Sequence, residues 1–210
     1  MLLKKLQQIY KMINLSKIID DVPHNLFKVF YEKAIENKQK NIEAISISSF
    51  DFDLKEVESR MVNLKYIIDN EWTFFSNYMS LKAKNFNSHN QISALFFWES
   101  INVQIRIKAR ISKAKSELSD EHYIGRKVEK NVLAVSSMQS QKIDSYDEVL
   151  KNYKDTLKDS AKIKNRPDYW GGFTFVPYYF EFWEGHESRL NKREVYEIDS
   201  NEWKQGILQP

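Results

Sequence analysis

The chain has 210 residues, with 32 Lys and Arg against 29 Asp and Glu, a formal net charge of +3 and no cysteine. This length favours one compact domain that needs no disulfide or metal to bury a core. The lack of cysteine excludes disulfide scaffolds, thiolate metal sites and cysteine nucleophiles, and the nearly balanced charge gives no large basic surface for nucleic acid.

The first expected element is an N-terminal helical extension, residues 1–24, in which Leu2, Leu6, Ile9 and Ile13 would share one helix face. We interpret it as a helix docked on its own domain, with a membrane-surface anchor as the alternative. Charges interrupt its apolar positions and no cleavage site follows, which argues against secretion. The longest apolar run, residues 94–98, is too short for a membrane span. We therefore expect a cytoplasmic protein with neither a membrane nor a nucleic-acid partner.

A single domain is expected over residues 25–210, and it opens with a helix at residues 25–37, where apolar residues recur every three or four positions. The period then changes to two, which is typical of half-buried strands. A turn signal at Asp69 and Asn70 predicts a hairpin, and a short helix is expected at residues 80–88. The strands predicted in this half are residues 42–50, 59–68, 71–76, 91–98 and 102–111.

Helical patterns follow at residues 118–130 and after a capping box that runs from Ser145 to Glu148. The chain then returns to short aromatic strands, at residues 173–176, 179–183, 192–196 and 203–207. Seven or more strands without β-α-β alternation indicate a mainly β fold with flanking helices, built as an antiparallel barrel.

Several kinds of chemistry are excluded by what the sequence lacks. Its five glycines form neither a dinucleotide-binding nor a P-loop motif, so any phosphate must be held mainly by side chains. Its four histidines show no metal-ligand spacing, and no metal is expected. Arg106, Lys108 and Arg110 fit a solvated strand face, which leaves the basic side chains of residues 60, 65 and 82 as candidates.

Three C-terminal motifs carry a family resemblance: Arg166-Pro167-Asp168-Tyr169-Trp170-Gly171-Gly172-Phe173, then Phe180-Glu181-Phe182-Trp183-Glu184-Gly185, then Arg189-Leu190-Asn191-Lys192-Arg193. Together they closely resemble the signature of the pyridoxine (pyridoxamine) 5′-phosphate oxidases, FMN enzymes of vitamin B6 metabolism. Further motifs match in the same order from about Leu26 onward. The resemblance implies an FMN-binding split β-barrel and a homodimer with FMN at the subunit interface.

The same resemblance assigns the cofactor residues. Those expected to bind FMN are Arg60, Met61, Val62, Asn63, Leu64, Lys65, Phe75, Ser76, Lys82, Gln104, Gln139, Ser140, Trp183 and Arg193. Arg60 and Lys82 would bind the FMN phosphate by charge-assisted hydrogen bonds, while Leu81 replaces an arginine of the family pattern.

The substrate residues match less completely. The resemblance assigns Lys65 and Arg126 to the substrate phosphate and Arg189 to the substrate ring, as the catalytic residue. Asn191, also expected to bind substrate, replaces a histidine and cannot titrate near neutral pH. His122 and Lys130 stand where the family has tyrosine and serine.

The leading hypothesis is an FMN-dependent oxidase that takes a hydride from C4′ of pyridoxine or pyridoxamine 5′-phosphate and gives it to flavin. O₂ would be the acceptor, in the biosynthesis of pyridoxal phosphate. A divergent split-barrel flavoprotein that acts on another small molecule is the alternative enzyme. A flavin-binding or interaction module without turnover and a nucleic-acid-binding barrel are the alternatives from other classes.

Overall fold

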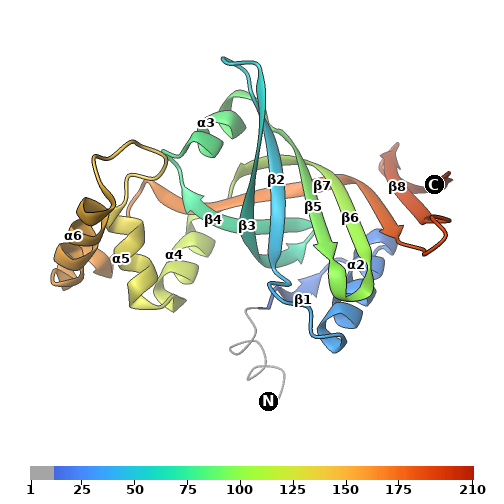
Figure 1. The fold of residues 1–210 in the computed structure, drawn as a ribbon, viewed down its shortest axis with the longest axis horizontal. Coiled ribbons are helices and arrows are strands. Elements are labelled where there is room, and N and C mark those ends of the chain that lie inside the picture. Colours follow the sequence, from blue (N-terminus) through green and yellow to red (C-terminus); the bar gives the residue numbers. More distant parts are fainter. Residues whose placement is uncertain (1–11) are drawn as a thin grey trace.

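Alternating side chains build a partly closed barrel in the computed structural model, which describes residues 12–210 (Figure 1). In β6 every second residue from Val103 to Ile111 is buried, and the residues between them are half-buried or exposed. The ring runs β3, β2, β5, β6, β7 and β4, and β4 closes it by pairing with both β7 and β3. Its strands are β2 (Ala44–Asp51), β3 (Glu56–Asp69), β4 (Glu71–Asn77), β5 (Gln91–Trp98), β6 (Val103–Lys113) and β7 (Trp170–Glu184).

Three more strands extend this ring. The hairpin of β8 (Lys192–Asp199) and β9 (Glu202–Leu208) continues the sheet beyond β7. The short strand β1 (Asn14–Ile18) pairs with β3 in parallel, whereas every other strand pair is antiparallel in the described residues. The predicted fold class, mainly β with flanking helices in a split-barrel arrangement, is confirmed.

Helix α2 (Val22–Glu36) supplies part of the core. Asp21 caps its first turn by accepting the backbone N–H of His24 at 3.0 Å. Its Phe27 is fully buried, and the ring lies 4.5 Å from Trp72 and 5.6 Å from Trp98, measured between centroids. The aromatic residues that the sequence concentrates in strands are therefore mostly core.

The other helices lie outside the ring. Helix α3 (Leu81–Ser88) follows β4, and a single 3₁₀ turn (Glu99–Ile101) joins β5 to β6. Between β6 and β7 the chain forms a helical layer on one side of the barrel (Figure 1), made of α4 (Ser116–Gly125), α5 (Val128–Ser136), α6 (Tyr146–Leu157) and α7 (Ser160–Lys164). In residues 12–210 no helix has the length and apolarity needed to cross a membrane.

Two predicted strands are in fact one. Residues 173–176 and 179–183 belong to the single strand β7, although Pro177 lies between them. Pro177 pairs with Ala109 at a shift in the register against β6, which leaves Tyr178 unpaired. A bulge of this kind admits a proline, which lacks the N–H that a regular ladder needs.

The helix predicted at residues 118–130 is also wrong in detail, because the chain breaks between α4 and α5. Gly125, a poor helix former, ends α4, and Arg126 is extended. At the N-terminus, the predicted helix of residues 2–13 lies almost wholly outside the described residues. Of the extension expected over residues 1–24, the described part contains strand β1 and the start of α2, and it is not a continuous helix.

Candidate functional site

A cavity of 400 Å³ between β3 and α3 has two cations in its wall. It is lined by Glu58, Ser59, Arg60, Leu81, Lys82 and Ser140. Arg60 extends from β3 and Lys82 from the first turn of α3, so two separate elements bring positive charge to one place. Such an arrangement favours an anion with several oxygen acceptors.

Arg60 is held rigidly at this cavity. Its Nη1 donates to Ser49 Oγ at 2.7 Å and to the carbonyl of Ile47 at 3.2 Å, and its Nη2 donates to Glu58 Oε2 at 2.9 Å. Burial lowers the pKa of Arg60, while Glu58 acts in the opposite direction. The guanidinium still stays charged, because its ordinary pKa is far above neutral.

Lys82 is more buried and lacks a carboxylate partner. Only 8% of it is exposed, and its Nζ donates to Ser76 Oγ at 3.3 Å and Ser80 Oγ at 3.4 Å. Within the described residues, no acidic oxygen lies within 4.0 Å of this Nζ. Burial and then the charge of Arg60 lower the pKa of Lys82. A buried ammonium whose partners are hydroxyls gains stability from a bound anion, so these residues fit a phosphate group.

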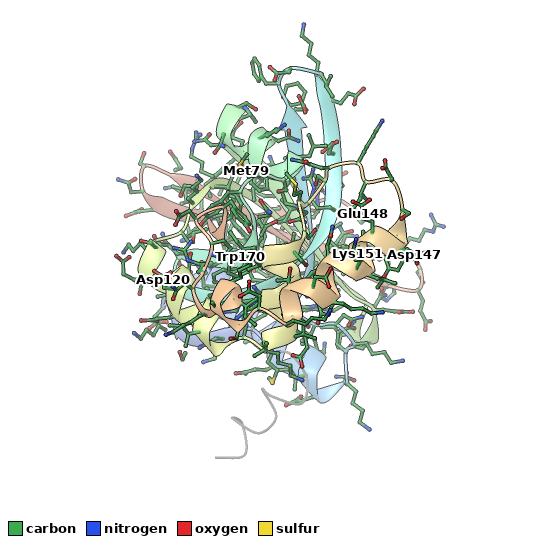
Figure 2. All side chains as sticks on the ribbon, turned by 90° about the vertical axis from the view of Figure 1, so that its left-hand side faces the viewer. Met79, Asp120, Asp147, Glu148, Lys151 and Trp170 are labelled. Carbon is green, nitrogen blue, oxygen red and sulfur yellow. The ribbon has the colours of Figure 1, made fainter. Side chains whose placement is uncertain are left out.

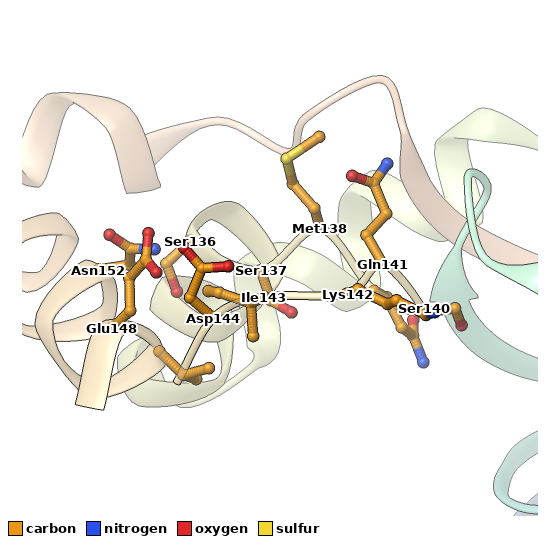
Figure 3. A pocket seen from close by; sticks show the side chains of 12 residues that line it. Ser136, Ser137, Met138, Ser140, Gln141, Lys142, Ile143, Asp144, Glu148 and Asn152 are labelled. Carbon is orange, nitrogen blue, oxygen red and sulfur yellow. The ribbon is translucent and has the colours of Figure 1, made fainter. Parts of the chain in front are cut away.

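Ser76 links this cavity to the loop after α5. Gln139 Oε1 accepts hydrogen bonds from Ser76 Oγ and from the backbone N–H of Asn77, both at 3.3 Å. Ser140 follows in the left-handed region, with φ 71°. The loop and the start of α6 line a further cavity of 500 Å³ (Figure 3). The structure thus brings together Ser76, Lys82, Gln139 and Ser140, which the sequence predicted from separate motifs.

Next to these residues, three rings are stacked almost in parallel. Phe75 and His122 lie 3.7 Å apart between centroids at 6°, and Trp170 lies 5.6 Å from Phe75 at 13°. Tyr66 bonds His122 Nδ1 through its hydroxyl at 2.9 Å. Trp170 is on the side of the molecule covered by α4 to α7, which faces the viewer in Figure 2. The stack forms an aromatic wall.

Positive charge surrounds this wall. Burial, followed by the charges of Arg126, Lys65 and Lys130, lowers the pKa of His122 to about 3. His122 is therefore neutral at physiological pH. It contributes hydrogen bonding and stacking here, and the neighbouring cations supply the charge.

Arg126 has an unsatisfied donor at this place. Its Cζ lies 4.2 Å above the centre of Trp170, and its Nη2 donates to the carbonyl of Lys130 at 3.1 Å. Its Nη1 is buried without a partner in the described residues, and burial lowers the pKa of Arg126 to about 10. A cavity of 210 Å³, lined in part by Arg126, Lys130, Gln139 and Trp170, lies beside it. The orphaned N–H fits a second anion.

Lys65 approaches the cluster from β3. Its Nζ lies 3.7 Å from Oε1 of the buried Glu43. Other β3 residues assigned to the cofactor point elsewhere: Leu64 is fully buried in the core, Val62 packs against it, and Met61 and Asn63 are exposed. A ligand in the described cavities would reach Leu64 only through its backbone.

A second group of predicted residues forms one row across three strands. Gln104 on β6 is opposite Trp183 on β7, which is opposite Arg193 on β8. Arg193 and Arg106 both pair with the buried Glu181, at 2.8 Å and 2.9 Å. Arg189 and Asn191 lie on the adjoining loop between β7 and β8. Asn191 Oδ1 accepts the backbone N–H of His186 at 3.0 Å.

These two groups are not brought together within one chain. We call the residues around Arg60, Lys82 and Arg126 the first group, and the row of Gln104, Trp183 and Arg193 with its loop the second group. Trp170, which Arg126 of the first group contacts, and Trp183 of the second group lie near opposite ends of β7, about 40 Å apart along the strand. The β7–β8 loop lies across the barrel from the helical layer (Figure 1).

Some residues of the site were missed from the sequence. Glu181 belongs to a recognised motif, but its two arginine partners are far away in the chain. The stacking of Phe75 on His122 joins residues 47 positions apart, which no local periodicity predicts. Trp170 belongs to the Trp-Gly-Gly motif, which is the sequence feature that could have identified one ring of this aromatic wall.

Comparison with known proteins links this geometry to one family. Residues 170–210 match the family model described as the pyridoxine 5′-phosphate oxidase C-terminal dimerisation region. The pyridoxine/pyridoxamine 5′-phosphate oxidase of Leptospira interrogans is 31% identical over 98% of this chain and 99% of its own. That of Haemophilus influenzae is 32% identical over 90% of this chain and 89% of its own.

Two solved structures share the fold. PhzG from Burkholderia lata, in complex with tetrahydrophenazine-1-carboxylic acid, has a TM-score of 0.84 at 23% identity. A pyridoxamine 5′-phosphate oxidase-related, FMN binding protein from Nostoc punctiforme has a TM-score of 0.73 at 9% identity. Each comparison covers 91% of this chain and 99% of the other.

Proposed function

Because the chain belongs to the pyridoxine/pyridoxamine 5′-phosphate oxidase family, we propose that it is an FMN-dependent oxidase that forms pyridoxal 5′-phosphate from pyridoxine or pyridoxamine 5′-phosphate. O₂ is the electron acceptor in this proposal. The observation that carries it is the pair of cationic sites, one at Arg60 and Lys82 and one at Arg126, because the reaction needs a place for two phosphates.

The first phosphate is that of FMN. Lys82 and Arg60 hold it from α3 and β3, and the loss of the family arginine at Leu81 leaves these two cations as its charged partners. Gln139, already oriented by Ser76, provides an amide for the polar edge of the flavin. When bound at these residues, FMN would supply the hydride acceptor and the redox link to O₂.

The second phosphate is that of the substrate. Lys65, Arg126 and Lys130 surround it, and the free Nη1–H of Arg126 supports this role most directly. His122 replaces the family tyrosine as a neutral, stacked ring. These residues fix one end of the substrate, so that the other end is held against the flavin ring.

A homodimer completes the site in this proposal. Each site combines the first group of one subunit with the second group of the other, which agrees with the separation of the two groups in one chain. Gln104, Trp183 and Arg193 then contact FMN, and Arg189 lies over the substrate ring. The match of residues 170–210 to a dimerisation region supports this arrangement.

Steady-state turnover tests the proposed reaction. Purified protein loaded with FMN is given pyridoxine 5′-phosphate, and O₂ consumption, H₂O₂ and pyridoxal 5′-phosphate are measured together. We expect equal amounts of the three. Unphosphorylated pyridoxine is the control, and it should be turned over poorly because the cations around Arg126 then have no anion to bind.

A second candidate function is a divergent flavoprotein of the same family with another small substrate. The substitutions at His122, Lys130 and Asn191 favour it, because all three are on the substrate side. It predicts that FMN binds normally while neither B6 phosphate is oxidised. Turnover of pyridoxine 5′-phosphate at rates of about 1 s⁻¹ or more would exclude it.

A further inference from the structure

His186 lies in the loop between β7 and β8, and the proposed function gives it no role. The loop begins at Gly185, whose N–H donates to the carbonyl of Asn102 at 2.9 Å. A Cβ at Gly185 would lie 2.6 Å from Asn102 Cγ, so a larger residue would have to displace the Asn102 side chain. The start of the loop is thus fixed against the turn before β6.

The side chain of Asn191 closes the loop at its other end. Because its Oδ1 accepts the N–H of His186 at 3.0 Å, the acceptor of the amide is already used inside the loop. The backbone carbonyl of His186 accepts the N–H of Arg189 at 2.9 Å. Asn191 therefore positions the loop, and it is no direct replacement for the imidazole that the family has at this point.

The imidazole of His186 is oriented by the same loop. Its Nδ1 accepts the backbone N–H of Ser188 at 3.2 Å, which places the ring proton of the neutral form on Nε2. Nε2 has no hydrogen-bond partner among residues 12–210, and the side chain is exposed. The ring thus offers an oriented donor to a molecule outside its own chain.

Arg189 shares this loop and is itself conformationally restrained. Its φ is 60°, in the left-handed region that a residue with a Cβ seldom adopts. Backbone strain of this kind persists where surrounding contacts enforce it, and here the bond to His186 does so. His186 and Arg189 therefore form one preorganised unit.

We propose that His186 is a substrate-contacting residue, which donates a hydrogen bond from Nε2–H to an oxygen substituent of the substrate ring beside Arg189. Asn191 is the positioning residue that holds it. In this chain the imidazole at position 186 would take the place of the one that the family pattern has at position 191. This inference rests on the proposed function, because that function places Arg189 over the substrate ring in a site shared by two subunits.

An exchange experiment tests this role. His186→Ala should lower kcat/KM for pyridoxine 5′-phosphate about 10- to 100-fold, with FMN content, dimer mass and melting temperature unchanged. His186→Gln, whose side-chain amide can donate in place of the imidazole Nε2–H, should recover about tenfold of that loss while Asn191 stays in place. Glu187→Ala, an exposed neighbour in the same loop, is the matched control and should keep wild-type kinetics.

The outcomes separate this inference from the proposed function. If the wild type turns over and His186→Ala equals it, the inference is wrong and the proposed function stands. Loss of FMN or of the dimer in His186→Ala, or no recovery in His186→Gln, would also overturn it, since either result contradicts a hydrogen-bond donor role of the side chain. A wild type that oxidises neither B6 phosphate contradicts both.

Discussion

In the proposed function, FMN binding depends most on Lys82, because it is a buried cation with only hydroxyl partners. In the free protein its burial opposes the charged form, and its pKa is lowered. A bound phosphate would reverse that penalty by charge-assisted hydrogen bonds. A charged side chain at this position therefore lowers the stability of the FMN-free protein but raises its affinity for FMN.

Replacing Lys82 with methionine should change the FMN affinity and the stability of the FMN-free protein in opposite directions. We expect Lys82→Met to weaken FMN binding by about 1.5–3 kcal/mol, roughly 10- to 100-fold in Kd, while the FMN-free protein is as stable as the wild type or more so. Fluorescence titration of FMN and thermal unfolding measure the two effects. Lys84→Met, on the exposed face of α3, is the control. Equal Kd values for both variants would remove Lys82 from the cofactor site.

His122 gives a prediction about pH. Its pKa falls from an ordinary value of 6.5 to about 3 on folding, so between these pH values the unfolded chain holds the extra proton. The free energy of unfolding should therefore decrease as pH falls from 6.5, by up to about 1.4 kcal/mol per pH unit. His122→Phe keeps the stacked ring but not the proton, and it should lose this slope. Urea unfolding from pH 7 to 4 compares the two proteins, and parallel curves would contradict the burial of a neutral His122.

The sequence was a better guide to which residues belong to the candidate site than to which residues contact them. The motifs predicted Arg60, Lys82 and Gln139 from separate segments, and the structure brings these three residues near one another. The partners of His122 and Glu181 come from strands and helices far apart in the chain. Only tertiary packing determines such contacts.

Among the elements, strand β7 shows how two adjacent glycines shape the site. Gly171 and Gly172 pair with Ser76 and Phe75 on β4. A Cβ at Gly171 would lie 2.7 Å from Tyr78 Cζ, and one at Gly172 would lie 2.7 Å from Ala114 Cβ. The Trp-Gly-Gly motif thus has a packing reason, since it lets β4 and its neighbours approach β7 beside the aromatic wall.

Gly171→Ala should therefore destabilise the protein by about 1–3 kcal/mol through overpacking against Tyr78. The companion change Gly125→Ala has no neighbouring atom within 4 Å and ends a helix, so it should be neutral or slightly stabilising. Chemical denaturation measures both. The explanation fails if the two substitutions change the free energy of unfolding equally, or if Tyr78→Ala does not relieve the effect of Gly171→Ala.

Element types were predicted well where one pattern dominated. Strict alternation gave β6 within two residues of its observed ends, and β5 was predicted at its observed bounds. The capping box gave α6, whose Ser145 accepts the N–H of Glu148 at 3.2 Å. The sequence did not reveal β1, which pairs in parallel at the edge of β3, or the short α7. It also divided β7, because a bulge at Pro177 depends on pairing with β6 and not on local propensity.

In the molecule as a whole, the barrel separates the first group from the second group. Closure of the ring through β4 places the first group beside the helical layer, and the sheet extension through β8 carries the second group away from it (Figure 1). The fold therefore explains why the site needs two copies of the chain in the proposed function. Sequence resemblance alone implied the dimer, and the geometry supplies a physical reason for it.

Heterodimers test this arrangement. One chain carries Lys82→Met and the other Arg189→Ala, with different affinity tags so that mixed dimers can be purified. With FMN below the Kd of Lys82→Met, each parent homodimer should have little activity. The mixed dimer should regain about half of the wild-type rate per dimer, because one of its two sites contains both intact residues. A site built within a single chain would give no recovery.

In the proposed function this protein is an FMN oxidase of B6 phosphates, and its visible absorption spectrum follows the reduction of the flavin itself. The spectrum of the purified, FMN-loaded protein is recorded without O₂ before and after addition of pyridoxine 5′-phosphate. We predict that the yellow flavin bands bleach on addition and return when O₂ is admitted. A flavin that stays fully oxidised with both pyridoxine and pyridoxamine 5′-phosphate would contradict the proposed reaction, although the family and fold would stand.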